Sequence, residues 1–116
     1  MISFDDFAKV ELRTGKVLSA EPVEGSEKLI KLMIDIGEDG PRQILAGIAK
    51  FYATDELVGR TVIIVANLEP RMMMGLESQG MLLAADGELA SPDGGQGGKP
   101  IPLTTSEPVE PGVKIR

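Results

Sequence analysis

The sequence predicts an all-β domain, a five-stranded Greek-key barrel with short N-terminal and connecting helices. Three observations lead to this prediction. Short segments with strand-like patterning recur along the chain and are separated by turn residues. One capped helical turn lies between the third and fourth of these segments. The 116 residues fit a single domain, residues 1–116, that can bury roughly two-thirds of its unfolded surface.

The N-terminal segment has the features of a short helix. Ser3 can cap it, and two aspartates follow near the positive end of the helix dipole. Phe4, Phe7 and Val10 recur at helical spacing, so residues 3–10 should carry one apolar face. We expect this face to cover the end of the core. The alternative is that Phe4 and Phe7 contact another subunit.

Alternation and turn residues predict the first three strands. Thr14–Ala20 is compatible with a strand and is followed by a Glu-Pro pair. Lys28–Ile36 alternates cleanly, with its isoleucines and its leucine at position 32 on one face. Residues 37–41 form a glycine-rich turn, and Arg42–Ala46 is the returning strand of a hairpin.

The second half of the chain completes the barrel. Thr54–Gly59 is typical of a capped helical turn that ends at glycine. Thr61–Leu68 is apolar on both faces and should be a central strand, and Ser78–Ala85 is another strand. Asp86–Pro100, rich in glycine, predicts a long flexible loop. Two short strands should close the structure, Ile101–Leu103 and Val113–Ile115. This order indicates a barrel of the oligonucleotide/oligosaccharide-binding (OB) type.

The composition excludes several classes of chemistry. The chain has neither Cys nor His, which removes disulfides, the usual nucleophile–base pairs and the common zinc ligand sets. The serine within Gly75–Gly80 lacks the spacing of a nucleophile elbow. We therefore expect no catalysis by this chain, no cofactor and no metal. No apolar run approaches the ~20 residues that cross a bilayer, and no secretory signal is visible, so we expect a cytoplasmic protein without membrane contact.

Residues 67–81 are the least generic part of the sequence. They join two predicted strands through a proline and a glycine, so they should form a shaped connection at one rim. Asn67, Arg71, Ser78 and Gln79 offer polar groups that suit the edges of unpaired bases and their phosphates. The alternative is that Asn67 and Ser78 satisfy backbone groups of a tight loop.

The net charge of −6 means that any RNA site must be a local basic patch on an acidic body. Lys28, Lys31 and Arg42 lie on the predicted hairpin, where they could join Arg71 in such a patch. Met72–Met74 suit hydrophobic packing, or an exposed platform for a base or a partner.

With these residues in hand, the sequence resembles the C-terminal tRNA-binding domain of methionyl-tRNA synthetases. The same module occurs as a free-standing tRNA-binding protein and in endothelial-monocyte-activating-polypeptide-like factors. Its matching blocks run in order across about residues 4–85. They are Phe4–Val10, Arg13–Val17, Glu24–Leu29, Arg42–Ile48, Glu56–Arg60, Asn67–Met72 and Gly75–Ala84.

The resemblance implies an OB-fold that binds tRNA by shape and backbone, with little discrimination among tRNAs. It also implies a homodimer, as in bacterial members, and attachment to the catalytic part of a synthetase. Carried over by position, the resemblance places six residues at or beside the tRNA groove: Lys28, Arg42, Asn67, Arg71, Ser78 and Met81. Lys31 and Gln79, indicated by the sequence itself, complete the expected tRNA contacts.

One departure bears on affinity. Relatives tend to carry more Lys or Arg where this chain has Glu69 and Met72–Met74, and fewer cations should weaken phosphate binding. Two alternatives to tRNA binding therefore stay open. One is a module that only dimerises. The other is a peptide-binding secretion chaperone of the same fold, which the methionine cluster would suit.

Overall fold

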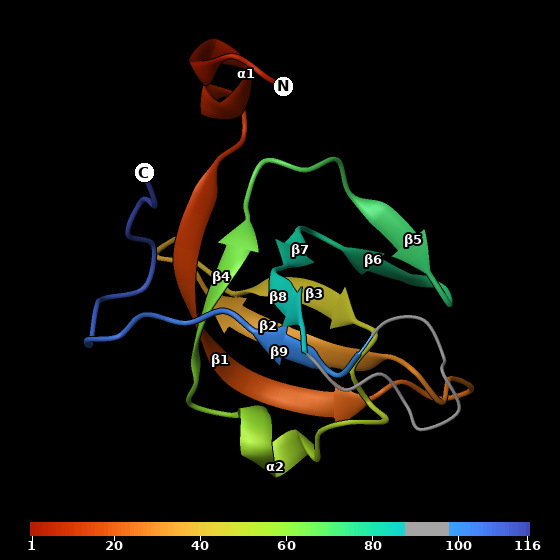
Figure 1. Ribbon diagram of the computed structural model, residues 1–116. Coiled ribbons are helices and arrows are strands. Elements are labelled where there is room, and N and C mark those ends of the chain that lie inside the picture. Colours follow the sequence, from red (N-terminus) through yellow and green to blue (C-terminus); the bar gives the residue numbers. More distant parts are fainter. Residues whose placement is uncertain (88–97) are drawn as a thin grey trace.

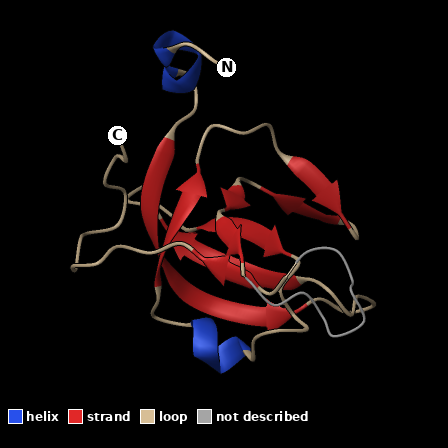
Figure 2. Ribbon diagram, in the orientation of Figure 1, coloured by secondary structure: helices blue, strands red, loops and turns tan. Residues whose placement is uncertain are grey.

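The computed structural model describes residues 1–87 and 98–116. These residues form a nearly closed β-barrel and two short helices (Figures 1 and 2). Five strands form one antiparallel sheet in the order β3-β2-β1-β4-β7. Their bounds are Leu12–Pro22 (β1), Ile30–Asp35 (β2), Arg42–Ala46 (β3), Thr61–Val65 (β4) and Met81–Leu82 (β7). The predicted all-β barrel of the OB type is confirmed.

The first three strands follow their predicted patterns. In β2, Ile30, Leu32 and Ile34 are buried and the residues between them are half-buried, as the alternation predicted. β3 has the predicted bounds. β1 is longer than predicted and continues through Pro22, because its last residues pair with the start of β2. This length lets β1 pair with both β2 and β4 and form the centre of the sheet.

The connecting helix and the central strand are also confirmed, but the predicted side-chain cap of the helix is wrong, because its N-cap is Ala53, which makes no side-chain cap hydrogen bond. α2 spans Thr54–Leu57 and turns into β4 through Gly59, whose φ of 88° lies in the left-handed region. Residues 62–65 of β4 are all buried, which explains why this strand is apolar on both faces. The strand ends at Val65, so its predicted extension to Leu68 is wrong, and Leu68 is exposed.

Residues 67–81 contain a hairpin that the sequence did not predict. β5 (Arg71–Met73) pairs with β6 (Leu76–Ser78), joined by a two-residue turn at Met74 and Gly75. Both turn residues have positive φ, 52° and 79°, the combination that matches the twist of a hairpin. The predicted shaped connection is therefore a second small sheet that packs against the barrel (Figure 1).

The single strand predicted over Ser78–Ala85 is wrong. The chain forms three short strands there: the end of β6, then β7, then β8 (Ala84–Asp86). Gly80 makes the first break, with φ of 146° and its Cα so close to β4 that an added Cβ would lie 2.9 Å from the Val65 carbonyl oxygen.

The C-terminal part closes the structure. β8 pairs with β9 (Pro100–Pro102), one residue earlier than the predicted strand at Ile101–Leu103. Asp86 and Pro100, the ends of the predicted flexible loop, are therefore paired with each other, and residues 88–97 of that loop lie outside the described residues. The strand predicted at Val113–Ile115 is reduced to a single bridge between Arg13 and Lys114.

α1 (Phe4–Ala8) stands away from the barrel (Figure 1). A capping box between Ser3 and Asp6 begins it, as the sequence predicted. No residue of α1 is buried, and Phe4 is 80% exposed. The expectation that its apolar face covers the core is therefore wrong, because the helix projects beyond the barrel instead of lying across its end.

Two hydrophobic clusters hold the molecule together. The larger one fills the barrel with residues of β1, β2, β3, β4 and α2. The smaller one lies outside it, where Val23, Leu29 and Leu45 meet Met73 and Leu76 of the β5–β6 hairpin. The second cluster fixes the hairpin against the outer face of β3. None of the helices in the described part of the chain has the length and apolarity to span a bilayer.

Candidate nucleic-acid interface

Ser78 and Gln79, two predicted RNA contacts, join β3 to the hairpin. The Ser78 hydroxyl accepts a hydrogen bond from the Leu45 amide at 3.0 Å and donates to the Gly80 carbonyl at 3.1 Å. The backbone N–H of Gln79 donates to the backbone carbonyl of Gln43 at 2.8 Å, and the side-chain oxygen of Gln79 accepts from the backbone N–H of Gln43 at 3.0 Å. We call these contacts the closing seam, because they complete the barrel where regular strand pairing is absent.

Arg42 belongs to the same seam. Its guanidinium donates to the carbonyls of Ala66 and Gln79, and it pairs with Glu38 through two hydrogen bonds of 2.9 Å. The hydrogen bond to Glu38 raises the pKa of Arg42, and the same bond lowers the pKa of Glu38. Arg42 is therefore held in place by four acceptors, with its charge matched by a carboxylate.

Asn67 ties α1 to the barrel. Its side-chain oxygen accepts from the Glu11 amide at 2.8 Å, and its side-chain nitrogen donates to the Lys9 carbonyl at 2.6 Å. Asn67 thus fixes the segment between α1 and β1. The alternative interpretation of the sequence was that Asn67 and Ser78 satisfy backbone groups, and the hydrogen bonds of both side chains are of this kind.

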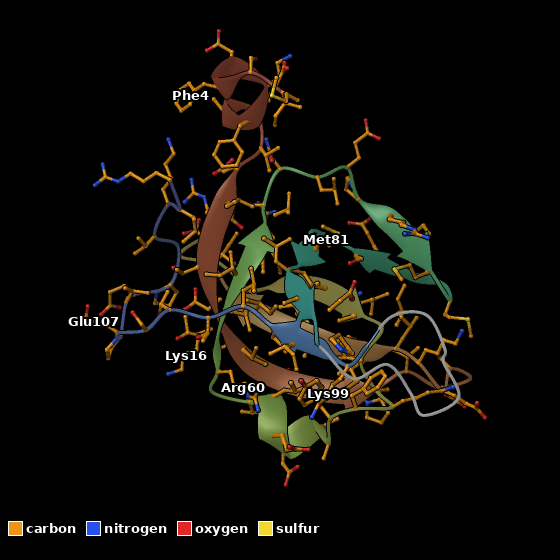
Figure 3. All side chains as sticks on the ribbon, viewed as in Figure 1. Phe4, Lys16, Arg60, Met81, Lys99 and Glu107 are labelled. Atoms are coloured by element: carbon orange, nitrogen blue, oxygen red, sulfur yellow. The ribbon has the colours of Figure 1, made fainter. Side chains whose placement is uncertain are left out.

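A small groove lies between the seam and the hairpin. It has a volume of about 160 Å³, and we call it the rim groove. Two exposed residues that were predicted to bind RNA, Arg71 and Met81, line this groove. Met81 is labelled in Figure 3. The full lining is Leu45, Leu68, Glu69, Arg71, Met73, Ser78, Gly80 and Met81.

A second, wider groove of about 390 Å³ borders the same hairpin, and we call it the hairpin groove. Lys31 lines it together with Met74 and Leu76 of the hairpin. Lys31 is half-buried, and its ammonium lies 3.5 Å from the exposed Glu21 carboxylate, an ion pair of little strength. Lys28 is exposed just before β2 and lines neither groove.

Apart from Lys31, which is half-buried and paired with Glu21, the predicted residues separate into two groups. The side chains of Arg42, Asn67, Ser78 and Gln79 make hydrogen bonds within the fold. Asn67 and Gln79 are nevertheless exposed, and the side-chain nitrogen of Gln79 makes no hydrogen bond within the described residues. Lys28, Arg71 and Met81 are exposed, and no ion pair holds either cation within the described residues. Sequence reasoning missed Glu38 and Gln43, the partners that hold the seam. Only Glu38 left a signal, an opposite charge four residues before Arg42 across a turn.

The rim groove presents apolar and charged groups side by side. Its apolar surface comes from Leu68, Met73 and Met81, and sulfur-containing side chains make favourable contacts with aromatic rings. Arg71 supplies a planar fork for a phosphate, although Glu69 in the same groove opposes it. Within residues 1–87 and 98–116, no three acidic side chains gather as metal ligands.

Comparison with known proteins identifies the family. Residues 12–114 match the family described as "Putative tRNA binding domain". The chain belongs to this tRNA-binding domain family. It is 52% identical over 115 residues to a methionine–tRNA ligase of Methanocella arvoryzae, and 53% identical over 116 residues to that of Methanoregula boonei. These alignments cover 99% and 100% of the chain but only 15% and 16% of the ligases.

Solved structures share the fold over the whole chain. The tRNA-binding domain superimposes on a MetRS-related protein from Pyrococcus horikoshii with a TM-score of 0.85 and 36% identity, covering 100% of this chain and 98% of that one. It also matches the chaperone CsaA from Bacillus anthracis, with a TM-score of 0.82, 30% identity and coverage of 100% and 99%. The sequence resemblance to the synthetase module is confirmed, and this chain corresponds to the tRNA-binding part of the ligases, not to their catalytic part.

Proposed function

We propose that this domain binds tRNA at the rim groove and the hairpin groove, largely without regard to sequence. The observation that carries the proposal is Arg71, an exposed fork beside an apolar groove in a member of a tRNA-binding family. Arg71, Lys31 and Lys28 meet phosphates, and Met81 lies against a base. Seam residues Arg42, Ser78 and Gln79 act mainly by fixing the shape of this rim.

The charge of the domain favours weak binding. Three cations around the rim support about three phosphate contacts. Each contact adds roughly 0.7–0.9 to the magnitude of the slope of log Kobs against log salt concentration. The rest of the surface is acidic, since the chain carries a net charge of −6. A weak site is useful when it is tethered to an enzyme, because tethering raises the local concentration of tRNA. We propose attachment to the catalytic part of a methionine–tRNA ligase, in the cytoplasm.

We also propose that α1 joins two copies of the domain. Ile2, Phe4, Phe7 and Val10 are all exposed, although large apolar side chains close together are unusual on the surface of a monomer. Asn67 fixes the start of β1 relative to this helix, so the apolar face has a defined direction. A second copy of the same helix would cover it.

The test is a titration of unfractionated tRNA at two salt concentrations, with the mass measured by light scattering on the same samples. Arg71→Gln should weaken binding several-fold and lower the salt slope by about 0.7–0.9. Lys114→Gln is the matched control, because Lys114 is exposed, lines neither groove and is not next to Lys28 in the chain or in the hydrogen bonds of the fold. Equal loss in both variants would show that only net charge matters and would remove the rim from the proposal.

The dimer has its own test. Phe4→Asp combined with Phe7→Asp should give a folded monomer, since no residue of α1 is buried in its own chain. Its melting temperature should fall only by the stabilisation that the dimer adds, and it should no longer depend on protein concentration. A dimer that persists in this variant would exclude α1 as the contact. A stable dimer of the unmodified domain that ignores tRNA would leave subunit joining as its function.

A second candidate is peptide binding. Met72 and Met74 at the hairpin tip are 64% and 58% exposed, and the fold is shared with the CsaA chaperones. Flexible methionines suit varied apolar partners. An unfolded polypeptide that competes with tRNA for the rim would support this role, and Met72→Ser with Met74→Ser should then weaken the peptide more than the tRNA.

A further inference from the structure

A third pocket lies at the opposite end of the barrel from the rim groove. Its volume is about 560 Å³, and we call it the Arg60 pocket. Thr61, the first residue of β4, lines it, whereas Met81 of the rim groove pairs with Val65 at the other end of that strand. The full lining is Arg60, Thr61, Pro102, Thr104, Thr105, Ser106, Glu107 and Pro108. None of these residues lines either groove at the rim.

Arg60 is held in position by its other contacts. Its Nε donates to the Glu56 carbonyl at 2.8 Å, and its guanidinium carbon lies 5.5 Å from the centre of the Tyr52 ring. Tyr52 is itself buried and donates its hydroxyl to the Pro100 carbonyl at 2.8 Å. Within the described residues, the two terminal nitrogens of Arg60 make no hydrogen bond or ion pair. A guanidinium fixed in this way loses little freedom when it binds an anion.

Two further cations lie near this pocket. The Lys99 ammonium is 4.8 Å from the centre of the same Tyr52 ring. Lys16 is exposed on β1 directly opposite Thr61 in the strand register, so the two side chains are neighbours. In Figure 3, Lys16, Arg60 and Lys99 lie along the lower part of the barrel, whereas Met81 lies higher in the view.

Hydroxyl groups complete the lining. Within the described part of the chain, Thr61, Thr104 and Ser106 make no side-chain hydrogen bond, while the Thr105 hydroxyl donates to the Glu107 carbonyl at 2.8 Å. Arginine forks together with Ser and Thr hydroxyls are the usual donors to phosphate oxygens in nucleic-acid complexes. The Glu107 carboxylate is the one acidic group of the lining, and it opposes an anion.

We propose that the Arg60 pocket binds a backbone phosphate of tRNA and gives the domain a second anchor, remote from the rim. The inference rests on the proposed tRNA-binding function. Two anchors at opposite ends of the barrel select nucleic acid by the spacing of its phosphates. That spacing is a property of shape, not of base sequence.

The experiment measures the salt dependence of tRNA binding by the full chain. Arg60→Gln should lower the slope of log Kobs against log salt by about 0.7–0.9, the value of one lost phosphate contact. Glu107→Gln should raise the affinity several-fold, because it removes a negative charge from the same lining and leaves its backbone carbonyl in place. Lys114→Gln, outside all three pockets, should leave the slope unchanged. A parental slope in Arg60→Gln, with unchanged affinity in Glu107→Gln, would overturn the proposal.

A second measurement separates this proposal from the wider function. Inorganic phosphate is titrated against the full chain while NMR follows the Arg60 side chain and the amides of residues 104–106. Saturable shifts that Arg60→Gln abolishes support the pocket even if tRNA fails to bind, and their absence then overturns it. If Arg71→Gln weakens tRNA binding and Arg60→Gln does not, the rim site stands and only the second anchor fails. If Arg60→Gln does not fold, Ser106→Ala and Glu107→Gln carry both readouts.

Discussion

Ser78→Ala tests whether the closing seam stabilises the barrel. The Ser78 hydroxyl is buried, 4% exposed, and both its hydrogen bonds run to backbone groups at 3.0 and 3.1 Å. Truncation removes the acceptor of the Leu45 amide and a donor to the Gly80 carbonyl. An unsatisfied buried group costs about 1–3 kcal/mol, and the carbonyl keeps a second lone pair, so the two together should cost roughly 2–4 kcal/mol.

That loss is a substantial fraction of the stability of a folded domain, about 5–15 kcal/mol. The assay is urea unfolding followed by far-ultraviolet circular dichroism, because the chain has no tryptophan. Ser19→Ala is the matched control. Ser19 lies on β1, is not fully buried and makes no side-chain hydrogen bond within the described residues, so its loss should change stability by less than about 0.5 kcal/mol. Equal stabilities of Ser78→Ala and Ser19→Ala would refute the reasoning that the seam depends on this hydroxyl.

Three further predictions follow from the polar contacts of the fold. Thr14→Val should lower the free energy of unfolding by about 1–3 kcal/mol in the same assay, because the buried Thr14 hydroxyl donates to the Glu110 carbonyl and accepts from the Val113 amide; an unchanged midpoint would show that these bonds contribute little. Glu38→Gln should weaken the pH dependence of stability. Since Arg42 lowers the pKa of Glu38 on folding, the contribution of this carboxylate is present above the ordinary carboxyl pKa of 4.5 and is lost as the pH falls through the lower folded pKa. Thermal melts from pH 7 to pH 3 should therefore show the parent and Glu38→Gln converging only at the acid end, and a constant difference would contradict this. Asn67→Ala should cost about 1 kcal/mol and speed hydrogen exchange at Glu11; unchanged exchange would mean that Asn67 does not hold the α1 connection.

The sequence alone determined the barrel, because local patterns specify it. The alternation in β2 and the double-sided apolarity of β4 identify buried strands wherever they occur in a chain. The strand at Arg42 was located by turn residues in the same way, and the helical turn at Thr54 formed although its N-cap residue makes no side-chain cap hydrogen bond. The ordered blocks from Phe4 to Ala84 also identified the family, which the match over residues 12–114 confirmed.

The tertiary structure decided what the polar side chains do. Ser78 bonds to Leu45, 33 positions away, and Asn67 bonds to Lys9, 58 positions away, and no local pattern reports such distances. These residues were expected at an RNA surface, but a side chain that can contact RNA can equally satisfy a backbone group that the fold leaves open. The same holds for α1. Its apolar spacing predicted a packing face, and only the path of the chain beyond the barrel showed that the face is exposed.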